Sequence, residues 1–207
     1  METTTTAGTK RFNGVWICYD YDGQLRDGPS FGYRMNGQLK YEATYKDGKQ
    51  HGRYVSYHAN GQILSKGSYK NGREHGPFVT YRDNGQLWEK VTLKDGKRNG
   101  RCVTFHNNGQ LDHKGSYRDG ERRGPWVGYW ENGQLWEKVT YKDGREHGLL
   151  VHFYKDGQLS LKITYEDGKQ RGPWVLYYPD GQLWMKGTHK DGKRGTILGL
   201  SMTTRFE

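Results

Sequence analysis

The chain repeats a single pattern of polar turn residues that separate stretches of alternating side chains. The string Asn-Gly-Gln-Leu, or a close variant, begins every 24 residues, at Asn36, Asn60, Asn84, Asn108, Asn132, Asp156 and Asp180. A second turn of the same kind, Asp-Gly or Asn-Gly, lies between these strings and begins at residues 47, 71, 95, 119, 143, 167 and 191. Asn-Gly and Asp-Gly favour two-residue type I′ turns, because both central residues take a positive φ. The spacing predicts tandem hairpins whose strands are about ten residues long.

Strict alternation assigns every repeat position to one face of the predicted sheet, because 24 is an even number. One face then holds Leu87, Val91 and Phe78, and the other holds a valine row, an aromatic row and a lysine row. The valines are residues 55, 79, 103, 127, 151 and 175, the Tyr or Phe residues are 57, 81, 105, 129, 153 and 177, and the lysines are 66, 90, 114, 138, 162 and 186. We interpret these rows as structural, because a lysine stem can cover a valine and a ring while its ammonium stays in water.

A second period of 48 residues lies on top of the first. Its members are the prolines 77, 125 and 173 and the tryptophans Trp88, Trp136 and Trp184, which alternation places on the lysine side. Smaller or polar residues take the tryptophan position in the intervening repeats. Two interpretations stay open: the gaps relieve crowding between rings, or they form spaced pockets.

The ends of the chain break the repeat. We expect a flexible tail over residues 1–11, a truncated first repeat with an irregular junction over residues 12–35, regular repeats over residues 36–193, and a cap over residues 194–207. The step from Asp22 to Asn36 is too short for a full repeat, which predicts a bend around Leu25 to Pro29. The fold class expected is all-β: an elongated single-layer antiparallel β-meander of tandem hairpin repeats with no substantial helix.

Composition narrows the function classes. Only 32% of the residues are hydrophobic and 31 are glycine, which argues against a thick two-layer core, whereas 16 Tyr, 7 Trp and 6 Phe argue against disorder. The formal net charge of +10 favours anionic partners: an acidic protein, nucleic acid or an anionic membrane. Cys18 and Cys102 form neither a disulfide framework nor a zinc motif. The start of the chain lacks the apolar core of a signal peptide, so a cytoplasmic protein is expected.

No catalytic, metal or cofactor site can be built from the sequence. His51, His75 and His147 share a turn position that is Asn or Arg in other repeats, so we interpret them as exposed polar residues. Glu89 and Glu137 would lie about 19 Å apart, too far for a glycosidase pair. The glycines match no phosphate-binding loop. We therefore expect a protein that is not an enzyme.

The repeat unit, as in DGKQRGPWVLYYPDGQLWMKGTHKDGK, resembles the MORN-type repeat in its bacterial 24-residue variant. The resemblance covers roughly residues 12 to 193. It implies an interaction scaffold, and bacterial proteins of this kind are often classed as antitoxins of toxin–antitoxin systems or as immunity partners. Self-association through sheet edges and attachment to phosphoinositide membranes are further roles that the family suggests.

The function expected is a non-enzymatic scaffold that binds another protein, a toxin or effector with an acidic surface. Nucleic-acid binding by the lysine and aromatic rows ranks second, and a scaffold on an anionic membrane ranks third. Tyrosine and tryptophan are favoured at interface centres, and lysines beside them suit an acidic groove. The partner-binding residues predicted on this basis are Trp88, Lys90, Trp136, Lys138, Trp184, Lys186, Tyr81, Tyr129 and Tyr177.

Overall fold

The computed structural model describes residues 9–12, 15–18, 27–190 and 193–198. These residues form β-strands and turns, with no helix and therefore none long and apolar enough to cross a membrane. The chain divides into two compact units, Met1–Gly100 and Arg101–Glu207, and the two are described separately. Strand β10 (Lys97–Phe105) contains the boundary between them.

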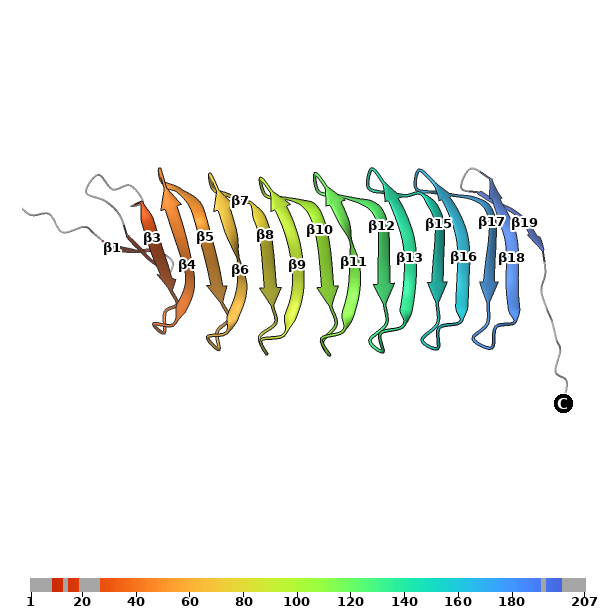
Figure 1. The fold of residues 1–207 in the computed structure, drawn as a ribbon, viewed down its shortest axis with the longest axis horizontal. Coiled ribbons are helices and arrows are strands. Elements are labelled where there is room, and N and C mark those ends of the chain that lie inside the picture. Colours follow the sequence, from red (N-terminus) through yellow and green to blue (C-terminus); the bar gives the residue numbers. More distant parts are fainter. Residues whose placement is uncertain (1–8, 13–14, 19–26, 191–192, 199–207) are drawn as a thin grey trace, which may run out of the picture. The chain divides into compact units, whose positions relative to one another are not determined.

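The first unit is an antiparallel meander in which each strand lies beside the one before it (Figure 1). Its strands are β3 (Gly28–Tyr33), β4 (Leu39–Lys46), β5 (Lys49–Tyr57), β6 (Ile63–Lys70), β7 (Arg73–Glu74), β8 (Gly76–Tyr81) and β9 (Leu87–Lys94). Strands β7 and β8 both pair with β6, so they act as two parts of one strand. Two further strands, β1 (Thr9–Phe12) and β2 (Val15–Cys18), pair with each other.

The second unit repeats this arrangement. Its strands are β11 (Leu111–Arg118), β12 (Glu121–Tyr129), β13 (Leu135–Lys142), β14 (Arg145–Glu146), β15 (Gly148–Phe153), β16 (Leu159–Glu166), β17 (Lys169–Tyr177), β18 (Leu183–Lys190) and β19 (Lys193–Leu198). Strands β14 and β15 both pair with β13. The predicted all-β class, a meander of tandem hairpins, is confirmed in each unit.

The Asp-Gly turns have the predicted conformation. Both central residues take a positive φ, as at Asp95 (52°) and Gly96 (81°), and the pattern recurs at the other described turns of this kind. Asparagine and aspartate tolerate this region because their short side chains bond locally, and glycine has no Cβ to clash. The two-residue type I′ prediction is therefore confirmed for these turns.

The Asn-Gly-Gln-Leu turns differ from the two-residue prediction. At Asn84, only the following Gly85 has a positive φ, of 81°. The amide of Gly85 donates to the carbonyl of Arg82 at 2.9 Å, and the amide of Arg82 donates to the carbonyl of Gln86 at 2.8 Å. The Asn84 side chain accepts from the Gln86 amide at 3.0 Å. These bonds define a three-residue loop, a turn closed by a left-handed glycine, rather than a type I′ turn.

A β-bulge follows each three-residue loop and changes which face the next residues occupy. In the second unit Gly128 pairs with Glu137 and Tyr129 pairs with Leu135, which leaves Trp136 as the extra residue. The same shift leaves out Trp88 in β9 and Trp184 in β18. Strict alternation is therefore wrong at this position, because one strand has two residues opposite one on its partner.

Each unit buries a row of apolar side chains on one face. In the first unit the row includes Ala43, Phe78 and Val91, and in the second it includes Trp126, Val139, Leu150, Ile163 and Trp174. The expected N-terminal tail and C-terminal cap fall largely on residues 1–8 and 199–207, outside the described part of the chain. The expected bend at Leu25 lies outside it as well, whereas Pro29 is in β3.

Candidate functional site

The two faces of the sheet differ in chemistry, as the residues of the second unit show. The aromatic face carries the buried row together with Trp136 and the histidines His113 and His152. The lysine face carries the lysines 114, 138, 162 and 186 with the valines 127, 151 and 175. The cross-strand register separates them, because Gly128 pairs with Glu137 whereas Val127 pairs with Lys138.

Large rings on the aromatic face lie over glycines of the neighbouring strand. A Cβ added to Gly115 would come within 2.2 Å of the Trp126 ring, and one added to Gly67 in the first unit would come within 2.4 Å of Phe78. The absence of a side chain there lets each ring settle on the backbone. Trp126 is only 4% exposed, and its indole donates to the carbonyl of Ser116 at 3.2 Å.

Trp174 occupies the same repeat position but has different neighbours. It too is 4% exposed, yet its indole nitrogen is buried without a hydrogen-bond partner. Ile163 stands opposite Trp174 in the register and is itself buried. Trp126 and Trp174 therefore share their burial but differ in the polar partner of the indole, and Leu150 takes this position in the repeat between them.

Trp136 is held in a cluster of polar and aromatic side chains. Its ring stacks on His152 with centroids 5.6 Å apart, and His113 meets it edge-on at 5.4 Å. A Cβ on Gly128 would lie 2.7 Å from Trp136 and 3.0 Å from His113, so this glycine makes the room that both rings use. His152 is hydrogen-bonded to Glu137 at 2.9 Å. These contacts fix the Trp136 ring on the aromatic face.

The other two predicted tryptophans are more exposed. Trp88 is 47% exposed and Trp184 is 42% exposed, whereas Trp136 is half-buried. Arg82 lies over the Trp88 ring at 5.8 Å, and Tyr178 lies beside Trp184 at 5.5 Å. The three equivalent tryptophans thus do not form a uniform row of surface rings.

Tyrosines near the Asp-Gly turns of the aromatic face have altered acidity. Burial and the nearby Glu74 raise the pKa of Tyr69 to about 12. Burial also raises the pKa of Tyr141, and the hydrogen bond that Arg122 donates to its hydroxyl at 3.0 Å partly offsets this. Both tyrosines are neutral donors or acceptors at physiological pH, which is a packing role rather than an acid–base role.

The lysine face presents cations that are aligned across the strands. Lys138 pairs in register with Val127 on one side and Val151 on the other, and Lys162 pairs in the same way with Val151 and Val175. The row lysines 114, 138, 162 and 186 are all exposed. Among the described residues no ion pair involves a lysine, since arginine and histidine supply every cation.

Aromatic rings lie beside two lysines of the row, Lys66 and Lys114, in the arrangement that the repeat pattern predicted. The Lys114 ammonium lies 5.3 Å from the centre of the Tyr129 ring, and in the first unit Lys66 lies 5.4 Å from that of Tyr81. Glu42 takes the lysine position in an earlier repeat. The Tyr57 hydroxyl donates to Glu42 at 2.7 Å, and this bond, with burial, raises the pKa of Tyr57. Both versions of the pair anchor a charged side chain by an aromatic one.

Two shallow depressions lie next to the prolines of the lysine face. One, of about 330 Å³, is lined by Arg101, Lys114, Pro125 and Val127 among others. The other, of about 390 Å³, is lined by Thr164, Arg171 and Pro173 among others. Leu149 takes the proline position in the repeat between them and is 46% exposed. The compact prolines thus leave hollows on either side of a protruding leucine.

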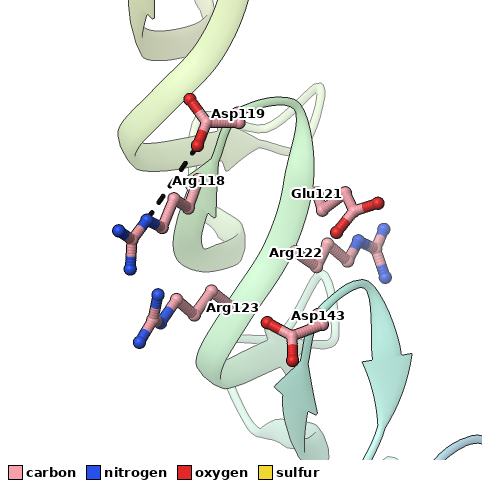
Figure 2. A pocket seen from close by; sticks show the side chains of 6 residues that line it. All are labelled: Arg118, Asp119, Glu121, Arg122, Arg123 and Asp143. Atoms are coloured by element: carbon pink, nitrogen blue, oxygen red, sulfur yellow. Dashed lines mark ion pairs between the residues drawn. The ribbon is translucent and has the colours of Figure 1, made fainter.

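A cluster of charges at an Asp-Gly turn forms a third cavity, of about 180 Å³ (Figure 2). It is lined by Arg118, Asp119, Glu121, Arg122, Arg123 and Asp143. Arg118 pairs with Asp119 at 3.9 Å, and Arg122 lies over the Trp126 ring at 4.5 Å. In Figure 2 Arg122 lies on the other side of the strand from Arg118 and Arg123. Because the guanidinium groups do not converge and three carboxylates accompany them, the cluster does not form an anion site.

The histidines and glutamates considered for chemistry have structural partners. His75 lies 3.4 Å from Asp95 and His147 lies 3.4 Å from Asp167, each the aspartate of the next Asp-Gly turn. Their side chains are 38% and 40% exposed, so both histidines are partly open to solvent. Glu89 pairs with Arg98 at 2.8 Å. Within the described residues no group of three or more His, Cys, Asp or Glu side chains could hold a metal ion.

The structure divides the predicted partner-binding residues between the two faces. Lysines 90, 138 and 186 and tyrosines 81, 129 and 177 share the lysine face by register. Tryptophans 88, 136 and 184 occupy the bulge position, and the contacts of Trp136 place it on the aromatic face. Sequence reasoning missed the two depressions, whose only signal was the 48-residue proline period. It also missed the histidine–carboxylate pairs around Trp136, which occur in single repeats.

Comparison with known proteins identifies the repeat. A family model described as MORN repeat variant matches residues 26–47, 50–71, 74–95, 98–119, 122–143, 146–167 and 170–191. No curated protein matches the chain. A solved chain from "Crystal Structure of TcdB2-TccC3-Cdc42" aligns with 89% of this chain at 13% identity and a TM-score of 0.24. The alignment spans only 12% of that much longer chain.

Proposed function

The chain belongs to the MORN repeat variant family, and we propose from this that it is a non-enzymatic scaffold whose lysine face binds another protein through an acidic surface. The observation that carries the proposal is the row of exposed lysines in the second unit, with valines between them and no ion pair to a described carboxylate. Surface cations that no carboxylate of the chain neutralises are available to pair with an incoming molecule.

The contacts of the aromatic face suit a role in stabilising the sheet rather than in binding a partner. Its rings are buried against glycines or held by histidines, and its carboxylates are paired, as at Glu137 and His152. A face whose rings and carboxylates are held by contacts within the chain serves to stabilise the sheet. Trp136, which the sequence suggested as a contact for the partner, has this stabilising environment. Trp88 and Trp184 are both exposed and stay predicted contacts of the partner.

A toxin or effector with an acidic surface is the partner that the sequence resemblance suggests, which would make this chain an antitoxin or immunity protein. The geometry favours a protein over a duplex for the lysine face. Row lysines lie about 10 Å apart, whereas phosphates along one nucleic-acid strand repeat at about 3.4 Å. Electrostatic complementarity of this type gives specificity and fast association.

The test is an affinity capture from source lysate with nuclease present, at about 150 mM salt, where weak exposed pairs are already partly screened. Three forms of the full chain are compared: the wild type, a row variant (Lys138→Glu, Lys162→Glu, Lys186→Glu) and a turn variant (Lys142→Glu, Lys169→Glu, Lys190→Glu). Both variants change the net charge equally, and all six lysines are exposed. Circular dichroism verifies that each variant is folded.

We expect the wild type and the turn variant to retain one stoichiometric protein that the row variant loses. Equal capture by the row variant would place the interface elsewhere on the chain. Recovery of only nuclease-sensitive material would replace the proposal with nucleic-acid binding.

A further inference from the structure

The lysine row of the second unit has a fixed spacing that a partner must match. Its members lie on alternate strands: Lys114 on β11, Lys138 on β13, Lys162 on β16 and Lys186 on β18. Strands β12, β15 and β17 lie between them and contribute the valines. Adjacent strands are about 4.8 Å apart, so neighbouring lysines are about 10 Å apart and the four span about 29 Å.

Packing holds the lysine stems close to this backbone spacing. Lys138 and Lys162 are each flanked by two valines in register, and Lys114 lies over the Tyr129 ring. A stem that rests on apolar neighbours loses fewer conformations on binding than a free lysine does. The row therefore presents its cations as an ordered ladder.

The spacing of the row lysines matches the side-chain spacing of one regular backbone conformation of a partner segment better than that of the others. A polyproline II helix has three residues per turn and rises about 3.1 Å per residue, so every third side chain falls on one edge about 9.3 Å apart. Nine residues then span about 28 Å. A β-strand presents one face every second residue, about 6.8 Å apart. An α-helix repeats at seven residues, about 10.5 Å, and its edge drifts by about 20° at each step.

We propose that the lysine face of the second unit recognises an acidic polyproline II segment of its partner protein, with a carboxylate at every third residue. The inference rests on the proposed function and names the class of partner segment. Pro125 and Pro173, each of which borders one of the depressions, lie four strands apart, about 19 Å, which matches two turns of such a helix. An apolar residue at every sixth position of the segment fits them.

The probe is a pair of synthetic peptides of equal charge, (Glu-Pro-Pro)4 and (Glu-Pro-Pro-Pro)4. Both adopt the polyproline II conformation, but the second rotates successive carboxylates by about 120° and spaces them by about 12 Å. Binding to the full chain is measured from amide chemical shifts at about 20 mM salt. The triplet peptide should bind about tenfold more tightly, the loss expected when two or three exposed charge pairs cannot form.

The shifts should map to the strands that carry the row. The row variant should lose the preference for the triplet peptide, and the turn variant should keep it. A row variant with Lys138→Met, Lys162→Met and Lys186→Met keeps the apolar stems and removes the charges, so it tests the same point if the glutamate variant does not fold.

Equal affinity for the two peptides overturns the match in spacing. If neither peptide binds while a twelve-nucleotide oligothymidylate binds through the row, the ligand class is nucleic acid and the inference fails. If the captured partner still requires the row lysines but neither peptide binds, the proposed function stands and only the polyproline II assignment is rejected.

Discussion

The two faces of the second unit arise from one repeat, yet they use it in opposite ways. On the aromatic face, copies differ in how each ring is accommodated: Trp126 lies over Gly115, and Trp136 lies in the space left by Gly128. On the lysine face every copy keeps a valine and an exposed lysine, although the position two residues before the valine alternates between proline and leucine. Variation on the first face solves local packing problems, whereas uniformity on the second creates a ladder with a constant spacing.

The largest expected effect separates packing from surface charge. Trp126→Ala removes a ring that is 4% exposed and leaves a cavity over Gly115, so the free energy of unfolding should fall by about 3–5 kcal/mol. Lys138→Ala on the other face should change it by about 0.5 kcal/mol or less. Urea unfolding followed by circular dichroism measures both. Equal effects would remove the distinction between the faces.

A smaller effect is expected where a glycine makes room for a ring. Gly128→Ala puts a methyl group within 3 Å of Trp136 and His113, and the backbone there does not need glycine because its φ is not positive. We expect a loss of about 1–3 kcal/mol from overpacking, and a Trp136 ring that moves toward solvent. Acrylamide quenching of tryptophan fluorescence should increase. Unchanged quenching and stability would show that the cluster adapts at little cost.

Replacing the two buried tryptophans, Trp126 and Trp174, with phenylalanine should lower the free energy of unfolding by amounts that differ by about 1 kcal/mol. Trp126→Phe breaks the hydrogen bond to the Ser116 carbonyl, whereas Trp174→Phe removes an indole N–H that has no partner. Trp126→Phe should therefore destabilise the protein more. Both variants lose the same side-chain volume, so the difference between their urea midpoints measures the contribution of the hydrogen bond. The reverse order would indicate that Trp174 has a partner in solution.

The smallest expected effect concerns pH and extends the comparison to the aromatic face of the first unit. Folding raises the pKa of Tyr69 from 10.0 to about 12, because of burial and Glu74. The folded state thus favours the neutral phenol, and its contribution to stability is complete below pH 10 and is lost as the pH rises toward 12. Between pH 10 and pH 12 the Tyr69→Phe variant should lose less stability than the wild type. Glu74→Gln should narrow the pH range over which stability is lost. Parallel losses in all three proteins would contradict the shift.

The sequence could predict the architecture because repetition and turn chemistry are local. The Asp-Gly turns need two positive φ values, and Asp95 and Gly96 adopt them as expected. The Asn-Gly turns were mispredicted because Asn84-Gly85 also suits the last two positions of a three-residue loop, where only the glycine is left-handed. The two conformations share one dipeptide signal, so composition does not separate them.

The faces of the candidate site were predicted only in part, because the bulge has no side-chain signal. Alternation placed Lys138 and Tyr129 together correctly, since no register shift separates Lys138 from Val127. It failed for Trp136 because that residue is the additional one in the bulge. Only backbone pairing determines this, and pairing is a property of two strands rather than of one sequence stretch.

The measurement that tests the lysine face most directly is lysine footprinting of the captured complex. The free chain and the complex with its partner are acetylated under identical conditions, and mass spectrometry gives the extent of modification at each site. We predict strong protection of Lys138, Lys162 and Lys186 in the complex, with Lys142, Lys169 and Lys190 modified as in the free chain. Protection of the turn lysines, with the row lysines still fully modified, would contradict the assignment of this face as the binding surface.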